Sequence, residues 1–134
     1  MATTTATLSL ASSDLTSDGL SLTATNTLYK AGTTIGLDQT TGLNKKVYAA
    51  AQSNTKLIDE GAFEDNTHNA VFIKNTGTST TDYFTITIGA SNFVIGRLYG
   101  GDFAFFPYEG EQDIDISSTG TNMELEYMVV YQAA

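Results

Sequence analysis

The sequence predicts an all-β protein folded as a single antiparallel β-sandwich, jelly-roll-like in its strand order. Short segments alternate between apolar and polar residues with a period of two, which is typical of half-buried strands. Glycine-containing turn signals separate these segments at short intervals. The 134 residues fit one domain, 1–134, with roughly nine or ten short strands. So many antiparallel strands must pack as two sheets or close up, because open edges promote aggregation.

The first expected strands lie at the N-terminus. Ala6, Leu8 and Leu10 alternate with hydroxyl residues, so residues 1–10 are expected to form an N-terminal arm or an edge strand. Such an arm could also extend onto a neighbouring subunit. Residues 20–24 alternate in the same way and predict a second strand.

The middle of the chain contains the only segment with helical character and the clearest hairpin signal. Residues 45–56 include three consecutive alanines, but the neighbouring β-branched and aromatic residues oppose a helix. Residues 71–74 and 83–88 both have strand patterns. The turn residues of 75–82 between them predict a hairpin with a long connection.

An aromatic segment follows, in which both strand faces are apolar. Phe103 and Phe105 share one face, whereas Phe106 and Tyr108 share the other. A sandwich strand needs only one apolar face, so one pair must be covered by a loop or by another chain. Interface or loop cover is the interpretation we favour over an exposed platform for stacking sugars.

The last strands are 113–116 and 123–131, and the final one changes character along its length. Its first half alternates with acidic residues, but Met128 and Val130 then take the polar positions. The second half is therefore expected to be covered on both faces, by the same chain or by a partner.

Charge and composition exclude several classes of function. Fifteen acidic residues against six Lys and Arg give a net charge of −9, which disfavours a phosphate-binding surface and an anionic membrane. We therefore expect neither a nucleic-acid nor a membrane partner. The absence of cysteine excludes disulfides and thiolate metal sites. The N-terminus has no secretory pattern and no apolar run is long enough to span a bilayer, so synthesis in the cytoplasm is expected.

Residues that carry chemistry are sparse. His68 is the only histidine, and no Gly-x-Ser-x-Gly elbow accompanies it, so we expect a polar loop residue and no enzyme. A metal at His68 would need further ligands from unconnected acidic residues. No phosphate-binding loop ends in the required lysine. No cofactor is expected.

Two acidic pairs are candidates for a site. Asp113 and Asp115 lie two residues apart, as do Glu124 and Glu126, and each pair would share one strand face. Such carboxylates could serve a retaining glycosidase or bind calcium. The interpretation we favour is a solvated face whose charges discourage edge pairing, with calcium as the next alternative.

The sequence offers several residues for contact with other chains. Arg97 is the only arginine, and it fits an inter-subunit salt bridge and an ordinary surface charge equally well. With the aromatic segment and the doubly covered strand, it completes the predicted interface set. That set consists of Arg97, Tyr99, Phe106, Tyr108, Met128 and Val130.

The C-terminal half, roughly residues 69–131, resembles small virion proteins of tailed bacteriophages. The resemblance is to aquatic phages in particular, including those that infect cyanobacteria. It rests on compositional motifs rather than catalytic ones, and the first half of the chain has no such resemblance. The segments that carry it are 71–77, 83–88, 97–103, 106–108 and 123–127.

The resemblance implies an all-β structural protein without enzymatic activity. Some such proteins are cement or decoration proteins that clamp the lattice of the major capsid protein, often as trimers. We therefore expect a homotrimer bound to the major capsid protein on the outer capsid surface of the virion. The alternative that the resemblance leaves open is a tail or head-fibre module that binds host glycan.

Overall fold

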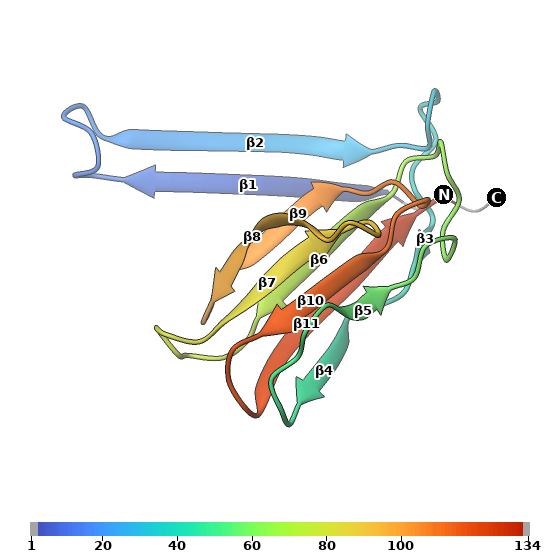
Figure 1. Cartoon of the computed structure of the whole chain (residues 1–134). Helices are drawn as coiled ribbons and strands as arrows, with labels where there is room; N and C mark the ends of the chain where they lie inside the picture. Colours follow the sequence, from blue (N-terminus) through green and yellow to red (C-terminus); the bar gives the residue numbers. More distant parts are fainter. Residues whose placement is uncertain (1–2, 133–134) are drawn as a thin grey trace.

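The computed structural model describes residues 3–132, which form two packed β-sheets and a separate hairpin (Figure 1). The described chain contains strands and no helix, so the prediction of an all-β fold is confirmed. The hairpin consists of β1 (Thr4–Ser12) and β2 (Leu20–Leu28). The four-stranded sheet contains β5 (Thr55–Ile58), β7 (Tyr83–Ile88), β8 (Phe93–Tyr99) and β10 (Ile114–Ser118). The five-stranded sheet contains β3 (Gln39–Thr40), β4 (Asn44–Tyr48), β6 (Ala70–Asn75), β9 (Phe103–Pro107) and β11 (Met123–Tyr131).

The strands of the two sheets pair as a nested set, and every pairing is antiparallel. One sheet has the order β5-β10-β7-β8, and the other has the order β3-β11-β6-β9, with β4 also pairing with β11. The innermost pair, β7 with β8, is enclosed in turn by β6 with β9, β5 with β10 and β4 with β11. A long hairpin wound into two layers produces this pairing. The order is that of a β-sandwich and is compatible with the expected jelly-roll-like arrangement.

The core lies between the two sheets and follows the period-two pattern of the sequence. In β6, Val71 and Ile73 point inward, while Phe84 and Ile86 do so from β7 in the opposing sheet. The ring of Tyr48 meets Phe84 edge-on, with 6.1 Å between centroids. Alternate side chains therefore fill the interior, as expected for a sandwich.

The predicted hairpin of 71–74 and 83–88 is wrong, although both strands exist. β6 and β7 lie in different sheets, and the connection 76–82 carries the chain from one layer to the other. The side chain of Asn75 supports this departure, because its Nδ2 donates to the Leu98 carbonyl at 2.9 Å and its Oδ1 accepts from the Gly77 amide. A period-two pattern identifies the faces of a strand but not its neighbours.

The region of 45–56 is extended and not helical, in agreement with the weight given to its β-branched residues. β4 ends at Tyr48 and β5 begins at Thr55, with an irregular connection between them. Asn54 ends that connection with a positive φ of 44°, a conformation that asparagine tolerates better than most residues.

The second half of β11 is covered on both faces, as the sequence predicts. Val129 lies in the main core, and the neighbouring Val130 is buried on the opposite face against Leu28 and Leu37. Met128 packs beside this small second cluster. The cover for Val130 therefore comes from the same chain.

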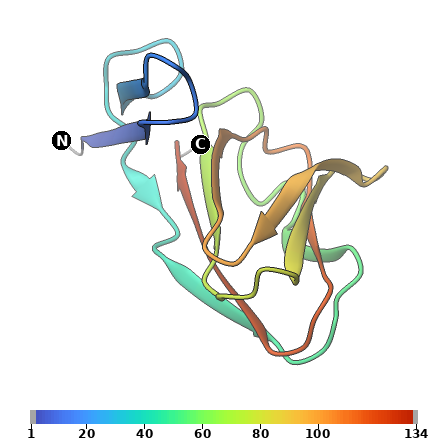
Figure 2. The same ribbon diagram turned by 90° about the vertical axis from the view of Figure 1, so that its left-hand side faces the viewer.

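The N-terminal segment is an arm and not an edge strand of the sandwich. Among the described residues β1 pairs only with β2, and Figure 1 shows the two strands projecting as a straight ribbon whose tip lies away from both sheets. The arm is longer than the expected 1–10, because the second strand returns to Leu28. Met1 and Ala2 lie outside the described residues. In Figure 2 the hairpin, viewed along its length, lies beside the five-stranded sheet.

Candidate interaction surface

The hairpin has one apolar face and one hydroxyl face. The register places Leu10 opposite Leu22, and Thr7 opposite Thr25 on the other side, where the two hydroxyl oxygens lie 3.3 Å apart. Neither strand contains a charged residue. The apolar face consists of Ala6, Leu8, Leu10, Leu20, Leu22, Ala24 and Leu28.

The apolar face of the hairpin is covered only at its base. Leu28 is buried against Leu37 and Val130, and Ala6 packs beside them. Further along, Leu8 is 41% exposed, and Leu10 and Leu22 are each 47% exposed. The leucines beyond the base thus present apolar surface to solvent.

The outer face of the five-stranded sheet is also apolar where the hairpin begins to diverge from it. Phe72 on β6 lies in register with Phe105 on β9 and Met128 on β11. The rings of Phe72 and Phe103 are 6.4 Å apart. Phe103 is 57% exposed and Phe105 is 46% exposed. These rings form a second apolar wall facing the hairpin.

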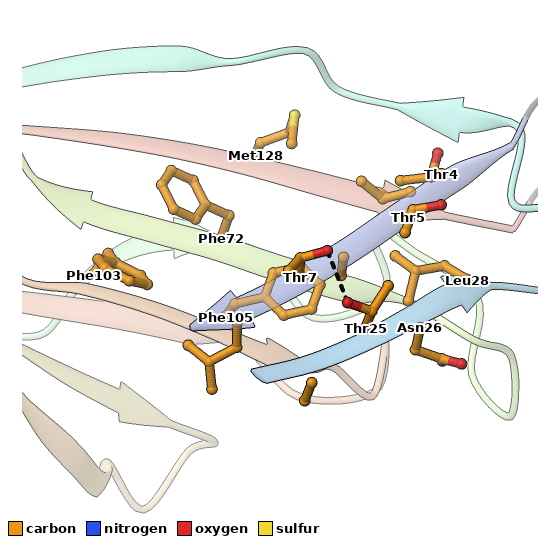
Figure 3. A pocket seen from close by; sticks show the side chains of 14 residues that line it. Thr4, Thr5, Thr7, Thr25, Asn26, Leu28, Phe72, Phe103, Phe105 and Met128 are labelled. Atoms are coloured by element: carbon orange, nitrogen blue, oxygen red, sulfur yellow. Dashed lines mark hydrogen bonds between the residues drawn. The ribbon is translucent and has the colours of Figure 1, made fainter. Parts of the chain in front are cut away.

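A groove of about 500 Å³, which we call the hairpin groove, lies between these rings and the part of the hairpin nearest its base, to which both hairpin faces contribute. Leu8 and Ala24 line it from the apolar face, whereas Leu10 and Leu22 lie further along the hairpin. Figure 3 shows Leu28 and Thr7 on the hairpin side, with Phe72, Phe105 and Met128 on the sheet side. None of the residues that line it is charged. The polar groups at its surface are hydroxyls and one amide, from Thr4, Thr5, Thr7, Thr25 and Asn26. The groove therefore suits an apolar occupant without charge.

Arg97 and Tyr99 of the predicted interface lie on β8, in the other sheet from the groove. The Arg97 guanidinium is 4.4 Å from the centroid of the Tyr83 ring, and the Tyr99 ring lies tilted against the same ring, with 5.1 Å between centroids. Arg97 is exposed and forms no ion pair among residues 3–132. The structure therefore separates these two residues from Met128, which lines the groove.

Phe106 and Tyr108 face inward, so the aromatic pair exposed on this segment is the other one. Tyr108 is only 4% exposed and meets Phe63 edge-on at 6.1 Å. Burial raises the pKa of Tyr108 to about 12, with a further contribution from the negative charge of Asp113. The cover is thus a loop of the same chain, and Tyr108, like the buried Val130, leaves almost no surface for a partner.

The exposed groove residues are absent from the predicted interface set, apart from Met128. The alternation of Leu8 and Leu10, and of Leu22 across the hairpin, was visible in the sequence. The signal that could have identified this surface is also in the sequence: neither hairpin strand contains a charged residue. The absence of charge distinguishes a strand face that is available for burial from an ordinary surface strand.

The acidic pair Asp113 and Asp115 is buried, so its expected place on a solvated face is wrong. Asp115 is 6% exposed, and its Oδ1 has no hydrogen-bond partner among the described residues. Burial raises the pKa of Asp115, as does the nearby charge of Asp113. Glu124 and Glu126 do lie on an outer face, each 3.6 Å from the ammonium of Lys45.

His68 forms a hydrogen bond that joins two distant segments of the chain. Its Nδ1–H donates to the backbone carbonyl of Tyr29, which ties the loop before β6 to the end of the hairpin. Within residues 3–132, no three acidic or histidine side chains gather closely enough to bind a metal ion. The same residues include no helix long and apolar enough to cross a bilayer.

Comparison with known proteins gives no relative for this fold and surface. No protein-family model, no curated protein and no solved structure matches the chain. The functional interpretation therefore depends on the surface itself and on the sequence resemblance of the C-terminal half.

Proposed function

We propose that this chain is a non-enzymatic virion structural protein, a capsid cement or decoration protein. In this proposal it binds the lattice of the major capsid protein on the outer surface of the shell as a homotrimer. The observation that carries the proposal is the presence of two separate exposed apolar surfaces on one small acidic chain. One is the hairpin groove, and the other is the free edge of β8.

The β8 edge is suited to a partner that offers a β-strand or an apolar surface. Phe93, Val94 and Ile95 are consecutive and exposed, and in the part of the chain that the structure describes β8 pairs only with β7. Its outer backbone edge is therefore free to accept a further strand. Exposed apolar surface of this kind marks an interaction site in a soluble protein. A protein that binds both its own copies and a shell needs two such surfaces.

The surface chemistry is also appropriate for repeated, weak contacts. Hydroxyl side chains lose less free energy than charges when they leave water, so the hairpin can be buried at low cost. Several copies linked on one lattice would bind by avidity, although each contact is small.

The decisive experiment is a reconstruction of the virion together with a binding assay on shells that lack the chain. Density for the chain at capsid lattice positions and co-sedimentation with these shells are expected. The double variant Phe93→Ser/Val94→Ser should reduce co-sedimentation, whereas Glu111→Gln, in an exposed loop, should not. Density confined to the tail, or no affinity for shells, would refute the proposal.

A second candidate is a tail or head-fibre module that binds host glycan. It is favoured by the exposed rings of Phe103 and Phe105 beside threonine hydroxyls in the hairpin groove. Sugars stack on aromatic rings and hydrogen-bond to polar groups at their edges. A glycan array distinguishes the two, because binding that Phe103→Ala and Phe105→Ala abolish would support the fibre module.

A further inference from the structure

We propose that the hairpin groove is occupied by the hairpin of a second copy of this chain. In this arrangement, the exposed leucines of one hairpin insert against the phenylalanines of the neighbouring copy. The inference goes beyond the capsid proposal and does not depend on it, because it concerns contacts between identical chains. It assigns a function to the groove, whereas the β8 edge is left for a different partner.

The hairpin itself requires a cover. A two-stranded ribbon in water is at best marginally stable, and it becomes stable when a third strand or an apolar surface packs against it. Within residues 3–132, β1 and β2 have no other strand partner, and only the base of the apolar face is buried. The exposed leucines beyond the base are therefore expected to be covered in the assembled protein.

The charge distribution favours a second copy as that cover. Two copies that each carry a net charge of −9 repel one another, so they can meet closely only where their surfaces lack charge. Both strands of the hairpin and all the residues lining the groove are uncharged. The loop between the two strands carries two charged residues, Asp14 and Asp18. The two matching surfaces are thus the ones that identical chains can bring together.

The volume of the groove and the area of the hairpin face are also compatible with this contact. A cavity of about 500 Å³ is of the size that encloses a small-molecule ligand, comparable with a few leucine side chains. Strands of nine residues extend about 30 Å, so one face of the two-stranded hairpin covers about 300 Å². Part of this face is already buried at the base, so if each copy gives one hairpin and receives one, at most about 600 Å² per copy is buried, at the lower end of specific interfaces.

Packing of each copy's hairpin into the groove of the next copy, which we call hairpin exchange, can produce a closed ring of copies. When each copy donates its hairpin to the next one, the contact is head-to-tail, and two or three copies complete a cycle. The apolar walls are then buried throughout the ring, whereas the β8 edges remain outside it. A homotrimer formed in this way would present several β8 edges at once.

The first test is the oligomeric state of the full chain, measured by sedimentation equilibrium without any capsid protein. The wild-type chain is expected to form a discrete oligomer. Leu10→Ser/Leu22→Ser should weaken association by about 100-fold or more, since central apolar contacts dominate such interfaces. The matched control is Ser9→Ala/Thr23→Ala, an opposed pair on the hydroxyl face of the same hairpin, and it should associate normally.

The second test traps the contact covalently and does not depend on measuring an affinity. The natural chain has no cysteine, so single cysteines can be placed without background. Mixing Leu22→Cys chains with Phe105→Cys chains under oxidising conditions should yield a mixed disulfide dimer. Mixing Leu22→Cys with Glu111→Cys, a site in an exposed loop, should yield far less.

Three results would overturn the inference. They are a monomeric wild-type chain at every soluble concentration, an oligomer unaffected by Leu10→Ser/Leu22→Ser, and equal cross-linking in the two mixtures. Loss of shell binding with an intact oligomer would instead refute only the capsid proposal. The reverse outcome, shell binding by a monomer, would refute only hairpin exchange.

Discussion

The hydroxyl of Tyr108 donates a hydrogen bond of 2.6 Å to the backbone carbonyl of Gln112. This bond closes the loop between β9 and β10, and the Tyr108 ring is held beneath it against Phe63. The same loop brings Gly110 to the other covering segment, where its carbonyl accepts from the Gly61 amide at 2.8 Å. One buried tyrosine therefore links the strand end, its loop and the segment that covers the core.

Tyr108 is expected to ionise well above the ordinary pH of a tyrosine. Burial raises its pKa to about 12, whereas an unfolded tyrosine titrates near 10. Its contribution to stability is therefore fully present below about pH 10 and is lost as the pH rises towards 12. Ultraviolet absorbance of the phenolate, recorded for the wild type and Tyr108→Phe, should show one fewer late-titrating group in the variant.

The Tyr108→Phe variant also measures the loop hydrogen bond. Loss of the hydroxyl should lower the free energy of unfolding at neutral pH by about 1 kcal/mol, and the Gln112 carbonyl would lose this partner. Tyr29→Phe, at an exposed position, is the control and should leave stability unchanged. Equal stability of Tyr108→Phe and wild type would contradict this role.

The Asp115 carboxylate is expected to destabilise the protein at neutral pH. Its folded pKa is raised by burial, so the folded state binds this proton more tightly than the unfolded chain does. The penalty is present above the folded pKa and disappears as the pH falls towards the unfolded value of 3.8. Asp115→Asn should therefore raise the melting temperature at pH 7, with a gain that vanishes in acid.

The control for this prediction is Glu111→Gln, which removes the same charge from an exposed loop. A gain of equal size in both variants would mean that the net charge matters and the buried position does not. A fall in melting temperature when a chelator is added to the wild type, absent in Asp115→Asn, would instead indicate a bound cation.

The position of Asp115 illustrates what a strand pattern can and cannot predict. Alternation correctly predicted which residues of β7 point inward, because Phe84 and Ile86 are apolar and their neighbours are not. A polar residue on the other face was assumed to be solvated, but β10 lies in the middle of its sheet, between β5 and β7, and Asp115 is buried there. Burial of that face depends on strand order, which is set by contacts between distant parts of the chain.

The interaction surface was predictable only in part for the same reason. In the aromatic segment both alternating pairs are apolar, so the sequence could not decide whether Phe103 or Phe106 points outward. The structure decides it through the register of β9 with β6, which places Phe105 beside Phe72 on the outer face. The hairpin strands were each predicted, but their pairing with one another was not.

Gly100 is expected to be intolerant of any side chain. A Cβ placed there would lie 2.7 Å from the Thr78 carbonyl carbon and 2.8 Å from the Ser79 amide nitrogen, both backbone atoms. The Gly100 amide also donates to the Ser79 carbonyl at 3.0 Å, which fixes this close approach. Gly100→Ala should therefore destabilise the fold by about 1–3 kcal/mol in chemical denaturation.

The matched control is Gly96→Ala on β8. Apart from Gly96 itself and its two chain neighbours, no residue of 3–132 has a heavy atom within 4 Å of a Cβ at this position, and the Gly96 backbone is not in the left-handed region. Stability of Gly96→Ala should stay close to that of the wild type. Equal losses in the two alanine variants would contradict the close-approach argument.

Leu28 is expected to be the anchor of the hairpin, in contrast to the leucines further along it. It is buried with Leu37 and Val130, so Leu28→Ala removes contacts in a small cluster that has few others to compensate. The cost should be about 2–3 kcal/mol, borne locally at the hairpin base. Leu22→Ala, at a position that is exposed in a single chain, should cost much less under conditions in which the chain is monomeric.

Hydrogen exchange of the β1 and β2 amides provides the measurement, because Leu28→Ala should accelerate it while the amides of β6 and β7 remain protected. Unchanged exchange in Leu28→Ala would mean that the hairpin is held to the sandwich by other contacts, such as the bond between His68 and the Tyr29 carbonyl.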